Sequence, residues 1–385
     1  MAFDHERVAP RARDETPAGA NHAIDGATVL VDVNVGSVSN PSDDFERFVS
    51  GVRNRVDGLA AAWLSARMAE VAAHGAEVEA AADAVRSLVL RGGKRMRAVL
   101  LAAAYEACSG DKGAAAVGQV GVALELLQAY LLVHDDWMDG DELRRGGPSV
   151  PAMMRSRFAP RRAEFVSVLA GDLASAWSMR ALLDAELPPA RLLQASREFG
   201  RMAEDVVNGQ ILDVAETARD EGAVEAMHAL KTASYTVRGP VVMGAVLAGA
   251  PDGVVAGLTA FAEPLGIAFQ LRDDVLGVFG DPRAMGKSAG GDLRCGKRTA
   301  VVIEAMKEPR AAASLDRVLG RPEASEGELR AAIEQMAACG VRARIEERIA
   351  VRVGAARLAL AGVALTHHGR ALLASAIGAL TERDQ

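Results

Sequence analysis

Two groups of aspartates in this sequence have the residue type and spacing of a metal and phosphate site. Asp135, Asp136 and Asp139 follow the run Leu-Leu-Val-His, and Asp273 and Asp274 follow Phe-Gln-Leu-Arg. Carboxylates this close together repel one another unless cations neutralise them. Oxygen-seeking cations such as Mg²⁺ are the natural partners of such groups, and they commonly bind phosphate as well.

Helix geometry indicates how the first group would be arranged. Successive residues on a helix are about 100° apart, so Asp135, Asp136 and Asp139 would lie within an arc of roughly 100°. All three carboxylates are therefore expected to point into one cavity. The second group is smaller, because Gly277 stands four residues after Asp273. A solvated acidic helix end is the alternative for the first group, but the helix dipole disfavours carboxylates at a C-terminus, which favours a functional role.

Basic residues lie around both acidic groups. They fall in residues 91–97 (RGGKRMR), 144–146 (RRG), 231–232 (KT), 286–287 (GK) and 296–299 (GKRT). The glycines would let the backbone approach an anion closely. Each basic residue taken alone would be a solvated charge. Together they indicate two phosphate sites, one tied to the metal ions and one purely basic.

The elements that would position these residues are helices. Val120, Leu124, Leu127 and Leu131 form one apolar stripe at helical spacing. Similar patterns run through residues 85–105, 165–183, 192–214, 223–247 and 254–278 and on to residue 380, with breaks at Gly and Pro. No strand alternation or internal repeat is found after residue 41. The pattern predicts one all-α domain, residues 41–385, of a dozen or so helices.

Composition and the N-terminal segment limit the classes of protein to which the chain can belong. Residues 1–40 are rich in charge, Gly, Pro and Asn, which predicts a flexible N-terminal tail. A composition of 50% hydrophobic and 25% charged residues is typical of a soluble globular protein, and the net charge of −7 argues against nucleic-acid binding. Three cysteines without metal-type spacing, and the lack of a signal peptide, indicate the cytoplasm. Pro and acidic residues interrupt the most apolar stretch, residues 240–269, so no membrane span is expected.

The motifs resemble those of the trans-isoprenyl diphosphate synthases, the polyprenyl synthetase family. The matching segments, in order, are GGKRMR, LLQAYLLVHDDWMD, LRRGGPS, GQILD, KT, FQLRDD, GKSAGGD and GKRT, and the resemblance covers about residues 45 to 380. It implies an isoprenoid-synthase-type bundle around a central apolar cavity, a homodimer, and three Mg²⁺ per active site. The reaction that it implies joins isopentenyl diphosphate to an allylic diphosphate.

The resemblance also implies roles for individual residues. Asp135 and Asp139 would coordinate Mg²⁺ with Asp136 supporting them, and Asp273 would hold a further Mg²⁺. The residues implied for the allylic diphosphate and its leaving group are Arg144, Lys231, Thr232, Gln270, Lys287 and Lys297. Those implied for isopentenyl diphosphate are Lys94, Arg97, Gln128 and Arg145. Gly277 departs from the family, where a third aspartate is frequent, but we expect activity to survive.

This reaction suits a site of that kind. Cleavage of the allylic C–O bond leaves a carbocation and diphosphate, so metals and lysines would stabilise the developing anion. Apolar helices around the cation would exclude water.

The residues before the first aspartate bear on product length. In the family, the positions four and five before it form part of the floor of the tail pocket, and here they are Leu131 and Tyr130. One aromatic with one smaller neighbour is similar to synthases that make twenty-carbon geranylgeranyl diphosphate. A farnesyl or slightly longer product is the alternative, and Tyr130 could instead be ordinary core packing.

Two other functions share parts of this pattern. A terpene cyclase would have Ser or Thr at position 277 and Glu at 281, where this chain has Gly277 and Asp281, and it would not need a second diphosphate site. A non-catalytic subunit of a heteromeric synthase often loses residues of its acidic motifs, whereas the first motif here is intact.

Overall fold

The structure is a computed structural model that describes residues 41–111, 115–215, 220–280 and 290–382. The chain divides into residues 1–39 and residues 40–385, and every described residue belongs to the second unit. The predicted flexible tail, residues 1–40, lies outside the described residues, and so do Asp281 and Lys287.

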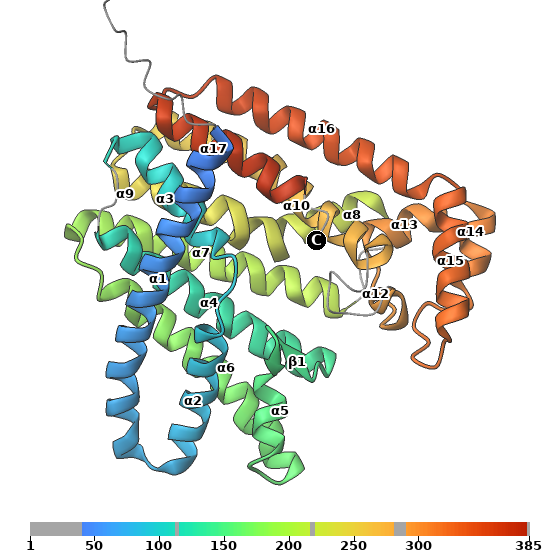
Figure 1. Cartoon of the computed structure of the whole chain (residues 1–385), viewed down its shortest axis with the longest axis horizontal. Coiled ribbons are helices and arrows are strands. Elements are labelled where there is room, and N and C mark those ends of the chain that lie inside the picture. The colour runs from blue at the N-terminus through green and yellow to red at the C-terminus, as the bar shows by residue number, and fades with distance from the viewer. Residues whose placement is uncertain (1–40, 112–114, 216–219, 281–289, 383–385) are drawn as a thin grey trace, which may run out of the picture. The chain divides into compact units, whose positions relative to one another are not determined.

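Helices make up almost all of the described residues, which confirms the all-α prediction (Figure 1). The α-helices are α1 (Pro41–Val71), α2 (Ala76–Leu90), α3 (Met96–Ser109), α4 (Ala115–Asp139), α5 (Val150–Arg155), α6 (Pro160–Leu183), α7 (Pro189–Val214), α8 (Glu221–His228), α9 (Gly239–Ala248), α10 (Asp252–Phe279), α12 (Gly291–Arg294), α13 (Ala300–Met306), α14 (Pro309–Leu315), α15 (Glu326–Ala338), α16 (Val341–Ala361) and α17 (His367–Thr381). A short 3₁₀ helix, η1 (Ala72–His74), links α1 to α2, and a π-helical segment, η2 (Ala229–Arg238), links α8 to α9.

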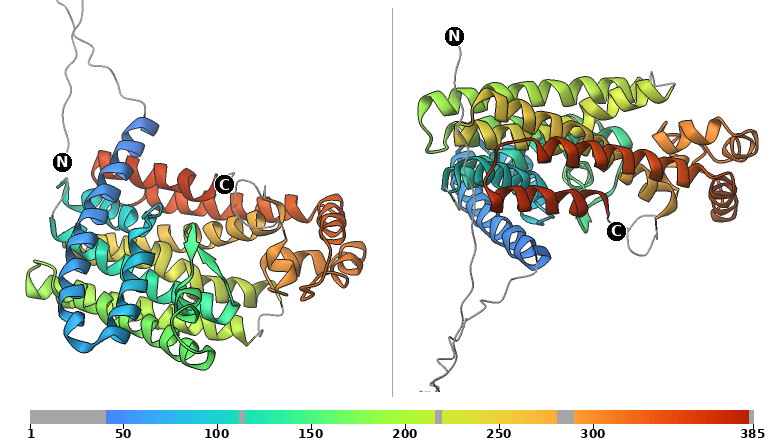
Figure 2. Two further views of the ribbon diagram at one scale, coloured as in Figure 1. Left: turned by 60° about the horizontal axis from the view of Figure 1, so that its bottom comes forward. Right: turned by 90° about the horizontal axis from the view of Figure 1, so that it is seen from above.

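The core lies between these helices and is mainly aliphatic. The principal packings are α4 on α6, α3 on α9, and α10 on α16 and η2. Three residues of the stripe predicted on α4 are buried, since Val120, Leu124 and Leu127 are at most 2% exposed. The fourth, Leu131, is half-buried. In Figure 2 the red helices α16 and α17 run beside α10, and both contact it. This packing fixes α4 and α10, the two helices that carry the acidic groups.

One short hairpin contradicts the prediction that no strand follows residue 41. β1 (Leu143–Arg144) and β2 (Gly147–Pro148) pair antiparallel. Between them Arg145 and Gly146 have φ values of 53° and 72°, and positive φ at both positions is what a two-residue turn of type I′ needs. Arg91 holds the hairpin by donating to the Pro148 carbonyl at 2.6 Å. Strands of two residues are too short to show alternation, so the sequence pattern could not reveal them.

The helical pattern of residues 223–247 is three segments rather than one helix. α8 ends at His228, the π-helical η2 contains Lys231 and Thr232, and α9 begins at Gly239. Gly209 of α7 lies directly against the backbone of Lys231, where a Cβ would overlap the Lys231 nitrogen. π-helical turns occur often at functional sites because they change the direction of side chains. Here the π-helical segment carries the Lys-Thr pair.

Two helices are long and apolar enough, by length and composition alone, to cross a membrane. They are α4 and α10, and 67% and 39% of their most apolar stretches are buried against the rest of the protein. Core helices of this length pass the same test. The absence of a membrane span stays a prediction.

Candidate functional site

The C-terminal end of α4 faces a set of lysines from other elements. Lys297, in the segment between α12 and α13, has its Nζ 2.7 Å from Asp139 Oδ2. Lys231 of η2 has its Nζ 3.8 Å from Asp135 Oδ1 and 2.5 Å from Oδ2 of Asp213, which lies on α7. Carboxylates and ammonium groups from four separate segments therefore meet at one place. Burial opposes the charge of Lys297, but Asp139, followed by Asp292 and Asp135, outweighs it and raises the Lys297 pKa.

Asp136 points away from this cluster, so the expectation that all three carboxylates share one cavity is wrong. It is completely buried, and its Oδ1 accepts a hydrogen bond from Arg144 Nε at 2.7 Å. Burial raises the pKa of the Asp136 carboxyl to about 6, against the opposing effect of Arg144. A step of one residue turns the side chain by about 100°, which carries it toward the hairpin. There Asp136 holds Arg144, whose guanidinium also lies 3.8 Å from Asp135.

The donor set fits a hard divalent cation that carries a diphosphate. Asp135 and Asp139 are one turn apart on α4, and the side chain of each is about 28% exposed. In the part of the chain that the structure describes, no three His, Cys, Asp or Glu side chains gather closely enough to hold a metal by themselves. The remaining ligands of a cation here would have to be phosphate oxygens or water, as Mg²⁺ prefers. Lys231 and Lys297, now paired with carboxylates, could pair with those phosphate oxygens.

In the second acidic group the two aspartates differ. Asp274 is 3% exposed and accepts hydrogen bonds from Gln270 Nε2 at 2.8 Å and from the Ala300 backbone N–H at 2.9 Å. It therefore anchors the start of α13, which follows directly after Lys297 and Thr299. Its neighbour Asp273 is half-buried on α10.

His228 is a site residue that sequence reasoning missed. Its Nε2 lies 3.6 Å from Asp274 Oδ2, its side chain is 5% exposed, and its Nδ1 is buried without a hydrogen-bond partner. It lines the same cavity as Lys231. The available signal was its position three residues before Lys231, on the same helical face.

The predicted basic phosphate site is formed by positively charged side chains that lie close enough to destabilise one another's charge. Burial lowers the pKa of Arg145, and the nearby guanidiniums of Arg95, Arg97 and Arg144 lower it further, while the carboxylate of Glu125 opposes them. Arg97 donates to Thr236 Oγ1 at 2.8 Å, and its guanidinium lies 4.3 Å from the centre of the Tyr235 ring. Such a cluster is costly without an anion, which indicates anion binding.

The other residues of and around this basic segment differ in how exposed they are to solvent. Lys94 is exposed next to the glycines, and Gln128 is half-buried on α4. Arg95 is 3% exposed and makes ion pairs with Glu125 at 2.5 Å and Asp57 at 2.8 Å. Arg95 is thus committed to the core, whereas its neighbours remain near the surface. The sequence alone did not separate these roles.

Three cavities adjoin the lysine cluster. The tail cavity, about 210 Å³, has Tyr130, Leu131, Leu132, Val206, Val207, Ile211 and Tyr235 among its walls, with Asp135, Lys231 and Thr232 also lining it. The polar cavity, about 140 Å³, is lined by charged and polar side chains that include Gln270, Asp292 and Lys297. The mouth cavity, about 390 Å³, shares Lys297 and Asp213 with the polar one. A ligand with a polar head and an apolar tail would fit these adjoining cavities, its head in the polar cavity and its tail in the tail cavity.

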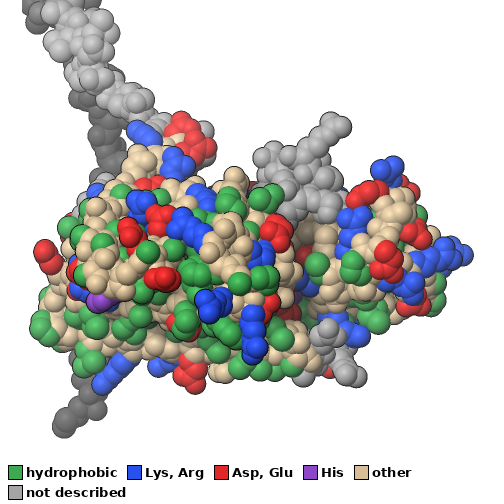
Figure 3. All heavy atoms as spheres, turned by 90° about the horizontal axis from the view of Figure 1, so that it is seen from below, with side chains coloured by type: hydrophobic (Ala, Val, Ile, Leu, Met, Phe, Trp, Pro, Cys, Tyr) green, Lys and Arg blue, Asp and Glu red, His purple; other side chains and the backbone are tan. Residues whose placement is uncertain are grey.

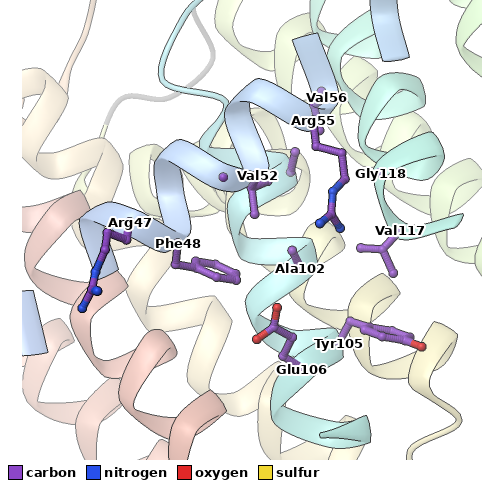
Figure 4. A pocket seen from close by; sticks show the side chains of 12 residues that line it. Arg47, Phe48, Val52, Arg55, Val56, Ala102, Tyr105, Glu106, Val117 and Gly118 are labelled. Carbon is purple, nitrogen blue, oxygen red and sulfur yellow. The ribbon is translucent and has the colours of Figure 1, made fainter. Parts of the chain in front are cut away.

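A fourth cavity has a different character (Figure 4). It holds about 140 Å³ between α1, α3 and α4 and is lined by Phe48, Val52, Tyr105 and other mainly apolar residues. Gly118 on its wall precedes Asp135 by 17 residues of α4, or about 25 Å of helix. No residue predicted to act in the site lies on it.

Charges on the face that Figure 3 shows are mixed rather than of one sign. The face in Figure 3 shows Lys and Arg side chains interspersed with Asp and Glu and with apolar side chains. A continuous basic surface, as nucleic-acid binders present, is not seen on this face. That the protein binds no nucleic acid stays a prediction.

Comparison with known proteins gives a family and several close relatives. Residues 78–336 match the family model described as polyprenyl synthetase. A geranylgeranyl diphosphate synthase of Methanosarcina mazei is 33% identical over 259 residues, which cover 67% of this chain and 76% of that protein. A (2E,6E)-farnesyl diphosphate synthase of Mycobacterium tuberculosis is 36% identical over 256 residues, covering 64% of this chain and 67% of that protein.

Solved structures agree with these relatives. The geranylgeranyl pyrophosphate synthase of Corynebacterium glutamicum, complexed with isoprenyl diphosphate and magnesium, is similar with a TM-score of 0.80 and 33% identity. That likeness covers 88% of this chain and 99% of the other. A geranylgeranyl pyrophosphate synthetase of Pyrococcus horikoshii is similar in fold, with a TM-score of 0.74 and coverage of 88% and 99%.

Proposed function

Because the chain belongs to the polyprenyl synthetase family, we propose that it condenses isopentenyl diphosphate with an allylic diphosphate to give geranylgeranyl diphosphate. The chain is a prenyltransferase of that family. The observation that carries the finer proposal is the lysine and carboxylate cluster that lines the entrance of an apolar cavity. A diphosphate head and a prenyl tail need these two environments side by side.

The residues of this chain would act on the two ends of the allylic substrate. Lys231 and Lys297 are drawn by their carboxylate partners toward the space where a diphosphate would lie, and Arg144 is oriented by Asp136. As the allylic C–O bond breaks, these cations would stabilise the negative charge that develops on the leaving diphosphate. The apolar walls of the tail cavity would keep water from the carbocation that remains.

The second substrate would be held by the basic residues of the α2–α3 junction and the hairpin. Arg97 and Arg145 would supply the charge for the diphosphate of isopentenyl diphosphate, and exposed Lys94 and half-buried Gln128 would add further donors. The isopentenyl double bond then attacks the carbocation, and loss of a proton completes the new prenyl chain. Arg97 stacks on Tyr235, which also lines the tail cavity, so the two substrates would meet at η2.

Mg²⁺ is the cation that we propose, with three ions per active site. It would be held by Asp135, Asp139 and Asp273, and when bound it would neutralise the diphosphate and assist its departure. Support comes from the oxygen-only donor set and from the magnesium in the Corynebacterium structure. A divalent cation of some kind is the coarser statement that the family supports.

Product length is proposed from the walls of the tail cavity. Tyr130 and Leu131 both line it, at about 7.5 and 6 Å along α4 from Asp135. The Tyr130 ring also packs edge-on against His134, with ring centres 4.8 Å apart, which fixes its orientation. A fixed aromatic on one side and an aliphatic neighbour suit a twenty-carbon product. A farnesyl product is the second candidate, because a farnesyl synthase is among the similar relatives.

A homodimer is the proposed assembly. α6 exposes Phe165, Leu169 and Leu183 at 54–62% on one stripe, and α7, which contacts α6, exposes Leu193, Ile211 and Val214 at 54–60%. Exposed apolar stripes on adjacent helices are unusual on a monomer and typical of an interface.

The cytoplasm is the proposed location. The three cysteines form no disulfide, which suits a reducing compartment.

The test is turnover by the purified full chain with Mg²⁺, isopentenyl diphosphate and, in separate reactions, dimethylallyl, geranyl or farnesyl diphosphate. Chromatography of the dephosphorylated products should give geranylgeraniol from each primer. A fifteen-carbon end product would replace the proposal with a farnesyl synthase. Cyclic hydrocarbon, or no consumption of isopentenyl diphosphate, would refute chain elongation.

A further inference from the structure

Two glycines let the neighbouring helices approach η2 unusually closely. A Cβ added at Gly209 of α7 would lie 2.2 Å from the backbone nitrogen of Lys231. A Cβ added at Gly266 of α10 would lie 2.5 Å from the Cβ of Ala233. Ordinary van der Waals contact begins at 3.4 Å, so only a residue without a side chain fits either position while η2 stays in place.

The two contacts lie on roughly opposite sides of η2. Lys231 and Ala233 are two residues apart, which on a regular helix is a turn of about 200°. Among the described elements, α7 and α10 are also the two that pack most extensively on η2. The segment therefore lies in a slot with a bare backbone on each wall. It cannot move away from one wall without meeting the other.

α7 contacts Lys231 at both of its ends. Gly209 meets the backbone of Lys231, and Asp213, one turn later on α7, accepts a hydrogen bond from the Lys231 ammonium at 2.5 Å. That Nζ lies 3.8 Å from Asp135 Oδ1. The separation of α7 and η2 therefore fixes where the ammonium lies relative to the acidic end of α4. Thr232, the next residue, lines the same two cavities as Lys231 and would move with it.

We propose that Gly209 is a positioning residue for prenyl transfer. Its bare backbone sets the separation of α7 and η2, and thereby the place of the Lys231 ammonium against the leaving diphosphate. The inference rests on the proposed function, in which Lys231 stabilises that diphosphate. Gly209 has no side chain with which to bind substrate, so it acts through Lys231 and Thr232. Gly266 supports it by closing the opposite wall of the slot.

Alanine at position 209 would displace η2 by an amount that this contact determines. The new Cβ would lie 2.2 Å from the Lys231 nitrogen, where ordinary contact needs 3.4 Å, so the two backbones would have to separate by about 1.2 Å. A displacement of about 1 Å in a group that acts on the reacting bond costs roughly a hundredfold in rate. Gly209→Ala is therefore expected to lower kcat about a hundredfold.

The matched control is Gly200→Ala, the same substitution in the same helix. In the part of the chain that the structure describes, a Cβ at Gly200 would meet no atom within 4 Å. This variant should keep the wild-type kcat within about twofold, as surface substitutions commonly do. The rates are measured on the full chain with saturating Mg²⁺, isopentenyl diphosphate and farnesyl diphosphate. Circular dichroism and urea unfolding verify that each variant is folded.

A double-mutant cycle separates the positioning of Lys231 from general damage to the fold. Lys231→Ala alone should lower kcat by roughly a hundred- to a thousandfold, because it removes a preorganised cation. In the Lys231→Ala background, Gly209→Ala should lower kcat by no more than about tenfold, since the ammonium that it would misplace is gone. The coupling would then be at least about tenfold, which is within the range for residues in contact.

A second variant tests the same slot from its other wall. Gly266→Ala presses on η2 at Ala233, and it enters the same cycle with Lys231→Ala. It should lower kcat by at least about tenfold in the wild-type chain, because the overlap is smaller than at Gly209, and by clearly less when Lys231 is absent. This cycle decides the question if Gly209→Ala does not fold.

Two results would overturn the inference alone. One is a folded Gly209→Ala variant with the wild-type kcat. The other is a loss of kcat by the same factor with and without Lys231, in either cycle, which would mean that the glycine only maintains the fold. A wild-type chain that does not elongate any allylic primer would refute the proposed function together with the inference.

Discussion

Replacing Tyr130 by alanine should lengthen the product by about one isoprenyl unit. Tyr130 lines the tail cavity about 7.5 Å along α4 from Asp135, so it meets the growing tail rather than the diphosphate. The substitution removes about seven non-hydrogen atoms and leaves a cavity of that size, against five carbons in one isoprenyl unit. The main product should therefore shift from twenty to twenty-five carbons. Loss of a half-buried ring costs about 2 kcal/mol, which a folded domain of this size tolerates.

The assay is chain elongation from farnesyl diphosphate, followed by chromatography of the dephosphorylated products. Tyr130→Phe is the matched control, because it keeps the ring and its edge-on packing on His134 and loses only the hydroxyl. The control should keep the wild-type product. If Tyr130→Ala is folded and active and its product distribution equals that of the wild type, Tyr130 is core packing and the length argument fails.

Three further predictions concern stability and assembly. Arg95→Met should lower the free energy of unfolding in urea by about 3–5 kcal/mol, because it removes the hydrogen-bonded partner of the buried Glu125 carboxylate and leaves Arg145, 4.0 Å away, as its weaker partner; a loss below 1 kcal/mol would refute this role. In the folded protein the pKa of Asp136 is about 6, raised from 3.8. The neutral carboxyl therefore contributes stability that is fully present below pH 3.8, and this contribution is lost as the pH rises to about 6. Wild type should lose stability relative to Asp136→Asn across that range, and parallel pH profiles in urea unfolding would contradict it. Leu169→Glu, on the exposed stripe of α6, should convert the dimer to monomer in sedimentation velocity, and an unchanged dimer would exclude this face.

Much of the fold is predictable because apolar residues recur at helical spacing. The runs predicted for α7 and α10 lie within three residues of the observed ends, since Pro188, Pro189 and Pro251 mark their beginnings. The pattern of residues 223–247 predicts one helix, because the π-helical turn of η2 changes the spacing by one residue only. The hairpin at Arg145 escapes prediction for a different reason, its strands being too short to show a period.

The site is predictable where charge type and spacing carry the chemistry, and less so where burial decides. Asp135 and Asp139 do face lysines from distant elements, Lys231 and Lys297. Asp136 has the same residue type, but it turns toward Arg144, and only the packing of the hairpin on α4 determines that.

Residues that contact the site from other helices are also not predictable from the sequence. His228 and Asp292 lie beside the predicted residues only because α8 and α12 pack against α10. For His228 the sequence offers only its spacing from Lys231, and for Asp292 it offers no periodic signal. Lys287, predicted for the allylic diphosphate, stays a prediction because it lies outside the described residues.

The central claim is that the carboxylates at the end of α4 bind the cations that drive prenyl transfer. Its most direct test is the elongation rate of the double variant Asp135→Asn/Asp139→Asn at saturating Mg²⁺ and substrates. Removal of two charged ligands should lower the rate by at least about a thousandfold, since a single preorganised electrostatic group is worth roughly a hundred- to a thousandfold. Circular dichroism should remain that of the wild type. Elongation by a folded double variant at the wild-type rate would contradict the account.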